Sequence, residues 1–282
     1  MNENSTYHIA LLIDGDNTQP DLLSNIIAEA GRYGKVTVRR IYGDWTISNM
    51  KGWKEQINRH AIRPMQQFAY TKGKNSTDSA MIIDAMDILH KKLVNAFCLV
   101  SSDSDYAGIA NRIREEGVFV MGIGRANTPE AFQKACEIFI YTENLKPDET
   151  VTVKPKAKPR TRTKPVSKKA AVEKAPVESE VKIEEPKHEK KPEVKVVTEI
   201  KNKITKKPLD ITLIEKAFEM SVQDDDMAHL SGIGIQLRRL DPSFDSRTYG
   251  YYSLTALFKS LSKQYEIVYK NKGSAPLIKL KK

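Results

Sequence analysis

The chain has 282 residues and a formal net charge of +10, and the whole of that excess arises from 18 basic and 8 acidic residues between positions 151 and 207. No apolar run approaches the roughly 20 residues that a membrane-spanning helix needs, which excludes a helical membrane protein, and no sorting signal is apparent. We therefore expect a cytoplasmic protein with about two domains.

Composition divides the chain into three parts. The basic stretch at 151–207 has six prolines, no glycine and no aromatic residue, so it cannot bury enough apolar surface to offset the entropy lost on ordering. We predict folded domains at 1–145 and 208–282, joined by a disordered linker at 146–207. Cys98 and Cys136 lie in apolar runs, as is typical of buried thiols rather than of a disulfide or zinc site.

Apolar runs rich in β-formers alternate with helix-like stretches through the first 145 residues, which predicts an α/β domain with a parallel sheet. The expected strands are residues 8–13, 35–42, 62–68, 96–101, 118–123 and 138–141, and the expected helices are residues 20–32, 48–59, 76–92, 106–116 and 129–135. Gly117 follows one of these helices, where a glycine can adopt the left-handed cap.

Acidic residues follow two of the predicted strands directly. Asp14 and Asp16 come after the first strand, and Asp103 and Asp105 come after the fourth. Because the carboxyl ends of parallel strands meet at one edge of the sheet, these carboxylates lie close together if the two strands are neighbours. Such a cluster favours Mg²⁺ or Mn²⁺, which prefer oxygen ligands, and Asp78 at the start of the third helix could complete the shell.

Structural explanations exist for each of these acids taken alone. Aspartate after a strand is also a common turn or cap residue, and Asp78 lies in a first helical turn, where the helix dipole stabilises a negative charge. Asp84 and Asp87 lie further along the same helix, on a face rotated away from Asp78. Two Asp-x-Asp motifs after apolar strands are less easily explained as turns.

Residues 8–144 resemble the NYN domain, a branch of the PIN-like nuclease superfamily. The motifs that carry the resemblance are Leu12-Ile13-Asp14-Gly15-Asp16-Asn17, Lys74-Asn75-Ser76-Thr77-Asp78 with Asp84 six residues on, Leu99-Val100-Ser101-Ser102-Asp103-Ser104-Asp105-Tyr106, and Gly117-Val118-Phe119-Val120. The sequence departs from the family pattern at Ser102, where the family often has glycine.

The resemblance implies metal-dependent cleavage of RNA phosphodiester bonds. It implies that Asp14 and Asp103 bind the metal directly and that Asp78 or Asp105 orients the attacking water, with no protein nucleophile. Further residues expected to support the metal ligands or the phosphate are Asp16, Asn17, Asp84 and Ser102.

Two other functions remain open. Residues 9–18 also match the Asp-x-Asp-x-Thr motif of haloacid-dehalogenase-type phosphatases, in which Asp14 would be phosphorylated and Asp16 would act as the general acid. A non-catalytic RNA-binding adaptor would use the same domain only as a surface. Candidate contacts with RNA here are the cations Arg39, Arg40, Lys72, Lys74, Arg112 and Arg125 and the aromatic residues Trp45, Trp53 and Tyr106.

The last 75 residues predict helices at 210–220, 234–240 and 253–261, followed by a hairpin of strands 266–269 and 277–280. Three helices and a β-hairpin are the arrangement of a small winged-helix domain. Residues 235–245, followed by Tyr249-Gly250-Tyr251 and Leu257-Phe258, resemble the LOTUS domain, also called OST-HTH. The resemblance implies a module that binds RNA or docks a protein partner. The candidate phosphate contacts are Arg238, Arg239, Arg247, Lys259 and Lys272.

Together, these features predict a ribonuclease that divides its work between two domains. The C-terminal domain would hold the RNA, and the lysine-rich linker would add an attraction that is independent of sequence and sensitive to salt.

Overall fold

A computed structural model describes residues 7–68, 76–145, 207–222, 226–269 and 274–281, so nearly all of the predicted linker lies outside the described residues. The two folded parts, 7–145 and 207–281, are described separately. Within these ranges, no helix has both the length and the apolar character needed to cross a membrane.

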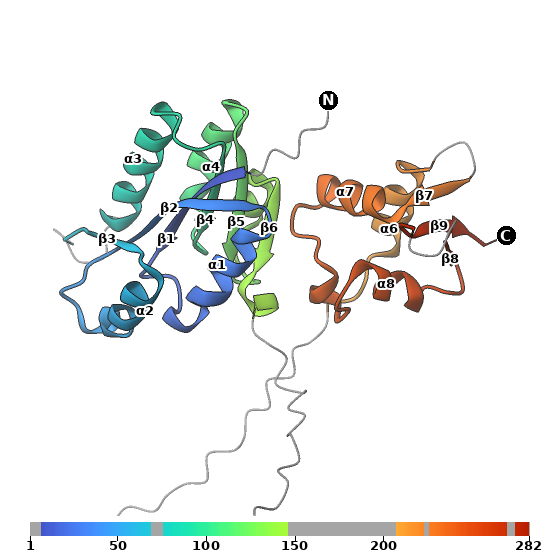
Figure 1. Ribbon diagram of the computed structural model, residues 1–282, viewed down its shortest axis with the longest axis horizontal. Coiled ribbons are helices and arrows are strands. Elements are labelled where there is room, and N and C mark those ends of the chain that lie inside the picture. The colour runs from blue at the N-terminus through green and yellow to red at the C-terminus, as the bar shows by residue number, and fades with distance from the viewer. Residues whose placement is uncertain (1–6, 69–75, 146–206, 223–225, 270–273, 282) are drawn as a thin grey trace, which may run out of the picture. The chain divides into compact units, whose positions relative to one another are not determined.

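The first part is built on a six-stranded sheet in the order β3-β2-β1-β4-β5-β6, and every neighbouring pair is parallel (Figure 1). This confirms the predicted α/β class. The strands are β1 (Tyr7–Asp14), β2 (Gly34–Gly43), β3 (Arg63–Gln66), β4 (Ala96–Val100), β5 (Phe119–Gly124) and β6 (Ile138–Tyr141).

Helices cover both faces of this sheet and enclose a separate apolar core on each side. The core on one face packs against α1 (Leu23–Gly31) and α2 (Trp53–His60). The core on the other face packs against α3 (Ser76–His90), α4 (Tyr106–Glu115) and α5 (Glu130–Ala135). The expected first two helices begin with short 3-10 turns, η1 (Pro20–Leu22) and η2 (Ser48–Gly52), before they become α-helical.

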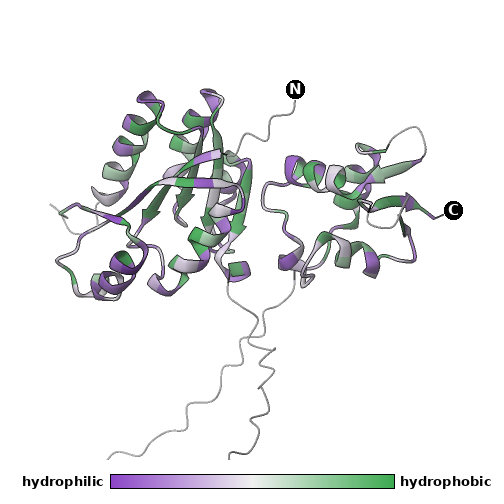
Figure 2. Cartoon of the chain, viewed as in Figure 1, coloured by the Kyte–Doolittle hydropathy of each residue, from purple (hydrophilic) through white to green (hydrophobic). Residues whose placement is uncertain are grey.

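The alternation of side chains along the central strands explains the two cores. Ile9, Leu11 and Ile13 of β1 face one core, whereas Ala10 and Leu12 face the other. The part of a strand that is buried on both faces is apolar, which is why residues 9–13 of β1 and all of β4 are continuous apolar runs (Figure 2).

Strand register places the first acidic motif beside the second. β1 pairs directly with β4, and Ile13 lies opposite Val100, so that Asp14 and Ser101 follow side by side at the carboxyl edge of the sheet. The chain leaves β1 toward β2 on one side and leaves β4 toward β5 on the other. This reversal of direction is where open α/β sheets form their ligand crevice.

The smaller C-terminal part confirms the winged-helix expectation of three helices and a hairpin. Its elements are α6 (Ile211–Glu219), β7 (Met227–His229), α7 (Leu230–Leu240), η4 (Ser246–Tyr249), α8 (Leu254–Ser260), β8 (Tyr265–Val268) and β9 (Leu277–Leu280). The strands form an antiparallel sheet in the order β7-β9-β8. Two sequence expectations need correction, because β7 was not predicted and α7 begins four residues before the expected start at Gly234.

Candidate metal centre

The loop after β1 is held rigidly at the carboxyl edge of the sheet. The Gly15 amide donates to the Tyr42 carbonyl at 2.9 Å, and the Trp53 indole donates to the Gly15 carbonyl at 3.2 Å. A Cβ atom at Gly15 would lie 2.8 Å from the Tyr42 carbonyl oxygen, so only glycine allows this close backbone approach. Asp14 and Asp16 therefore project from a fixed turn.

Asp14 is completely buried at the end of β1, and hydrogen bonds reach both of its oxygens. Oδ1 accepts the amides of Asp16 and Asn17 at 3.2 and 3.3 Å. Oδ2 accepts the Asn17 side-chain amide at 2.7 Å and the Ser101 hydroxyl at 2.8 Å. Ser101 in turn accepts the Asp103 amide at 3.1 Å, so one serine links the loops that follow β1 and β4.

Three further carboxylates form a cluster near Asp14. Asp78, at the start of α3, and Asp103 and Asp105, in the loop after β4, each offer an oxygen, and these oxygens lie within 4.8 Å of one another. The Tyr106 hydroxyl donates to Asp78 Oδ1 at 2.6 Å, and the Asp105 amide donates to Asp103 Oδ1 at 3.0 Å. The structure thus brings together three of the four aspartates that the sequence singled out, and the fourth, Asp14, is near enough for its charge to act on Asp78.

Burial and mutual repulsion disfavour the charged forms of these acids. Burial is the main cause that raises the pKa of Asp14, against the lowering effect of its hydrogen bonds with Asn17 and Ser101. Burial also raises the pKa of Asp78, and the negative charges of Asp14, Asp103 and Asp105 raise it further. A cation among these carboxylates would offset the repulsion.

The donor set fits a hard divalent ion. All four side chains offer carboxylate oxygen, and ligands at about 2.1 Å on opposite sides of one Mg²⁺ ion lie about 4.2 Å apart. Oxygens within 4.8 Å of one another therefore need only small movements to share an ion. Asp78, Asp103 and Asp105 are partly or fully exposed, which leaves room for water and a phosphate oxygen.

The expected supporting residues divide into two groups. Asn17 contacts Asp14 directly, and Asp16 is hydrogen-bonded to Thr77, with a pKa raised mainly by burial and then by the charges of Asp78 and Asp44. Ser102 points instead toward β5, where its hydroxyl accepts the Arg125 amide at 2.9 Å. Asp84 lies apart from the acid cluster, because its carboxylate accepts hydrogen bonds from Arg40 and Tyr42.

Most of the proposed RNA contacts in this domain are occupied within the fold. Trp53 and Tyr106 are buried to 1% and 0% exposure, so the suggestion that they stack on bases is wrong. Trp45 is half-buried and donates to the Met65 carbonyl. Arg39 donates to the His60 carbonyl, Arg40 pairs with Asp84, and Arg112 pairs with Glu115 and Glu116. Lys72 and Lys74 lie outside the described residues.

In the C-terminal part, the cationic candidates have different surroundings. Arg238 and Arg239 are exposed in the last turn of α7, and Lys259 is exposed on α8. Arg247 is partly buried and forms an ion pair with Asp245 at 2.6 Å, so a phosphate would compete with that carboxylate. Lys272 lies outside the described residues.

Sequence reasoning missed the roles of Ser101 and Tyr106. Ser101 joins Asp14 to the Asp103 loop, and Tyr106 holds Asp78. The signal for Ser101 is its position one residue after the strand that neighbours β1. Tyr106 gives no comparable signal, since an aromatic residue opening a helix is equally typical of a core.

Asp78→Asn should raise the melting temperature of the metal-free chain at pH 7 by about 1–2 °C. A raised carboxyl pKa means that the charged form destabilises the fold at this pH, and an amide removes the charge while retaining the oxygen that Tyr106 binds.

Mn²⁺ should stabilise the wild type more than this variant. Thermal unfolding with EDTA or Mn²⁺ checks both effects, and Asp87→Asn, on the exposed side of α3, is the matched control. Equal stabilisation of both chains by Mn²⁺ would contradict an ion at Asp78.

Comparisons with known proteins agree with the two resemblances. Residues 8–145 match the model of the NYN domain, and residues 196–275 match that of the OST-HTH/LOTUS domain. A solved structure of a protein of unknown function from Vibrio parahaemolyticus is similar at 17% identity and a TM-score of 0.42, over 49% of this chain and 94% of that one. No curated protein matches the chain.

Proposed function

We propose that this chain, which matches the NYN domain and, after it, the OST-HTH/LOTUS domain, is a metal-dependent endoribonuclease. The observation that supports the proposal most directly is the cluster of Asp78, Asp103 and Asp105, whose carboxylate oxygens approach within 4.8 Å at the carboxyl edge of the sheet. A nuclease-type domain with this cluster has the ligands needed to hold a divalent ion against a phosphate.

The chain's own residues have separate tasks in this proposal. Asp78, Asp103 and Asp105 would hold Mg²⁺ or Mn²⁺, and the buried Asp14 would add its negative charge to the site. Bound there, the ion supplies an activated water and offsets negative charge on the scissile phosphate. Asp78 or Asp105 orients the water, and Tyr106 fixes the position of Asp78.

A cleavage assay tests this function directly. Purified chain is incubated with labelled single-stranded RNA in Mn²⁺, Mg²⁺ or EDTA, beside Asp14→Asn and Asp103→Asn variants. We expect cleavage that requires metal and is lost in both variants. Internal cuts distinguish an endonuclease from an exonuclease, and a DNA strand of the same sequence shows how strictly the site requires RNA.

Two alternatives make different predictions for the same assay. An RNA-binding adaptor would bind the strand without cutting it in any metal. A phosphatase that uses Asp14 as its nucleophile needs that carboxylate to reach a substrate. Asp14 is 0% exposed and accepts hydrogen bonds on both oxygens, which disfavours this role.

We further propose that the LOTUS domain and the linker capture RNA for the nuclease domain. Removal of residues 146–282 should raise KM about tenfold to a hundredfold and leave kcat within about threefold, since tethering acts through effective concentration rather than chemistry. Residues 7–145 contain both of their own apolar cores, so the truncated chain can be tested. Steady-state kinetics on one RNA at several salt concentrations measures the effect. An unchanged KM would instead support docking of a protein partner on the LOTUS domain.

A further inference from the structure

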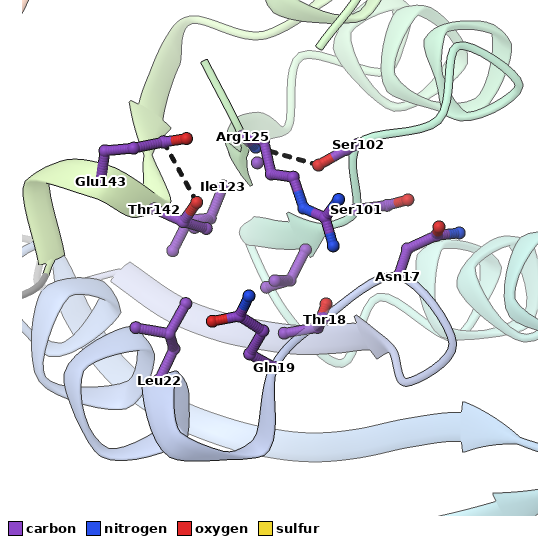
Figure 3. A pocket seen from close by; sticks show the side chains of 12 residues that line it. Asn17, Thr18, Gln19, Leu22, Ser101, Ser102, Ile123, Arg125, Thr142 and Glu143 are labelled. Carbon is purple, nitrogen blue, oxygen red and sulfur yellow. Dashed lines mark hydrogen bonds between the residues drawn. The ribbon is translucent and has the colours of Figure 1, made fainter. Parts of the chain in front are cut away.

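Figure 3 shows a pocket lined in part by Ser101 and Ser102, which directly precede Asp103 of the acid cluster. Its apolar residues belong to the core on the face of the sheet opposite α3. It is formed by the loop after β1 and by the ends of β4, β5 and β6, and it encloses about 440 Å³ of space including its open mouth. Leu22, Val100 and Ile123 form an apolar wall, and polar side chains surround the opening.

The pocket and the acid cluster share two residues. Asn17 and Ser101 line the pocket, and both donate hydrogen bonds to Asp14 Oδ2, at 2.7 and 2.8 Å. A chain-like ligand that crosses the edge of the sheet at this point would therefore meet the carboxylates on one side and the pocket on the other. The location is also the place where the sheet reverses direction between β1 and β4.

Hydrogen bonds to two consecutive backbone amides hold Arg125 beside the pocket. Its amide donates to the Ser102 hydroxyl at 2.9 Å, and the next amide, that of Ala126, donates to the Glu143 carboxylate at 3.1 Å. The Arg125 side chain points toward the pocket opening near Asn17 (Figure 3). Within the described ranges no ion pair engages its guanidinium, so this cation is available to an anion from outside.

The opposite wall offers a different chemistry. Gln19 is exposed and its amide faces the pocket, where it can both donate and accept a hydrogen bond (Figure 3). Behind it lie the aliphatic side chains of Leu22 and Ile123. The hydrogen-bonding edge of a base at the pocket mouth would meet Gln19, and an attached phosphate would lie toward Arg125.

From this arrangement we propose that the pocket binds the RNA nucleotide next to the cleaved bond. The base lies at the mouth of the pocket and is read at its edge by Gln19, while Arg125 binds the phosphate of the same nucleotide. The proposal rests on the ribonuclease activity proposed above, because the neighbouring phosphate would then lie at the acid cluster. It assigns base preference to the pocket rather than to the metal ligands.

Methyl NMR of the full chain tests the pocket independently of cleavage. The chain carries Asp103→Asn so that the probe, a trinucleotide RNA, stays intact, and the methyl signals of Leu22, Val100 and Ile123 report local binding. The compared chains add Arg125→Gln, Gln19→Leu or the control Arg59→Gln. Arg59 is exposed at the end of α2, four residues before β3 begins, and so at the opposite edge of the parallel sheet.

We expect Arg125→Gln to weaken the binding seen at these methyl groups at least about tenfold, Gln19→Leu about threefold to tenfold, and Arg59→Gln not at all. Only Arg125→Gln should reduce the slope of log K against log salt, by about 0.7, since it removes one phosphate contact. Thermal unfolding confirms that each variant is folded.

Two results would overturn the proposal. One is that the pocket methyl groups do not shift while RNA binds elsewhere on the chain. The other is that Arg125→Gln and Gln19→Leu bind like the control. Persistent cleavage by an Asp103→Asn chain would instead count against the proposed nuclease centre. The methyl titration would still show whether RNA binds in the pocket.

Discussion

Asparagine in place of Asp103 should lower the rate of metal-dependent RNA cleavage by about a thousandfold, equivalent to about 4 kcal/mol of activation free energy. The substitution removes one of the charges that would hold the ion. It retains the oxygen that accepts the Asp105 amide and the backbone amide that donates to Ser101, so the loop should keep its shape. Single-turnover cleavage in saturating Mn²⁺ measures the loss.

Asp87→Asn is the matched control for this experiment. Asp87 is exposed on α3 and lies 3.9 Å from Lys91, so its loss should change neither the fold nor the cleavage rate appreciably. A chain with Asp103→Asn that cuts as fast as this control would show that the metal, if required, is held elsewhere. Recovery at higher Mn²⁺ concentration would show that the lost rate reflects weaker metal binding.

Asp84→Ala should lower the free energy of unfolding by about 2–3 kcal/mol. The Asp84 carboxylate binds the Arg40 guanidinium and the Tyr42 hydroxyl, and the Arg40 and Asp84 side chains are only 20% and 17% exposed. Burial, together with Asp84, raises the pKa of Tyr42, which therefore remains a neutral donor at pH 7. Alanine leaves both donors without this acceptor, which is costly in a partly buried site.

Urea unfolding of the metal-free chain measures this effect, with Asp84→Asn as the comparison. The asparagine retains an oxygen acceptor, so its cost should be smaller. Below the unfolding transition, the Asp84→Ala chain should still cleave RNA at close to the wild-type rate, because Asp84 lies outside the acid cluster. A large loss of cleavage in a chain that remains folded would return Asp84 to the metal site.

The central strands could be predicted from the sequence because they are buried on both faces. A strand such as β4 must be apolar at each position, and the resulting run is easy to detect. β7 escaped detection since it has three residues, of which only Ala228 is buried. The early start of α7 was also missed, because His229 and Leu230 give no strong helix-start signal.

The candidate site could be predicted only in part. Asp14 and Asp103 were grouped on the condition that their strands are neighbours, and the pairing of β1 with β4 confirms it. The burial of Asp14 and the contact of Tyr106 with Asp78 could not be predicted, because they depend on how α3 and α4 pack on the sheet. Arg125 was one cation among several, and only the fold shows that it faces a pocket.

The serine that bridges Asp14 and the Asp103 loop also bears on how such a protein is made. Its bond to Asp14 joins positions 87 residues apart in the chain, so the centre cannot assemble from either half alone. A chain still emerging from the ribosome holds Asp14 long before β4 is available to pair with β1. Contacts this distant in sequence form late and cooperatively. If the chain cuts RNA as proposed, a nascent chain therefore has no assembled metal centre before β4 has been synthesised. The messenger RNA being translated would not be cut by that chain up to this point.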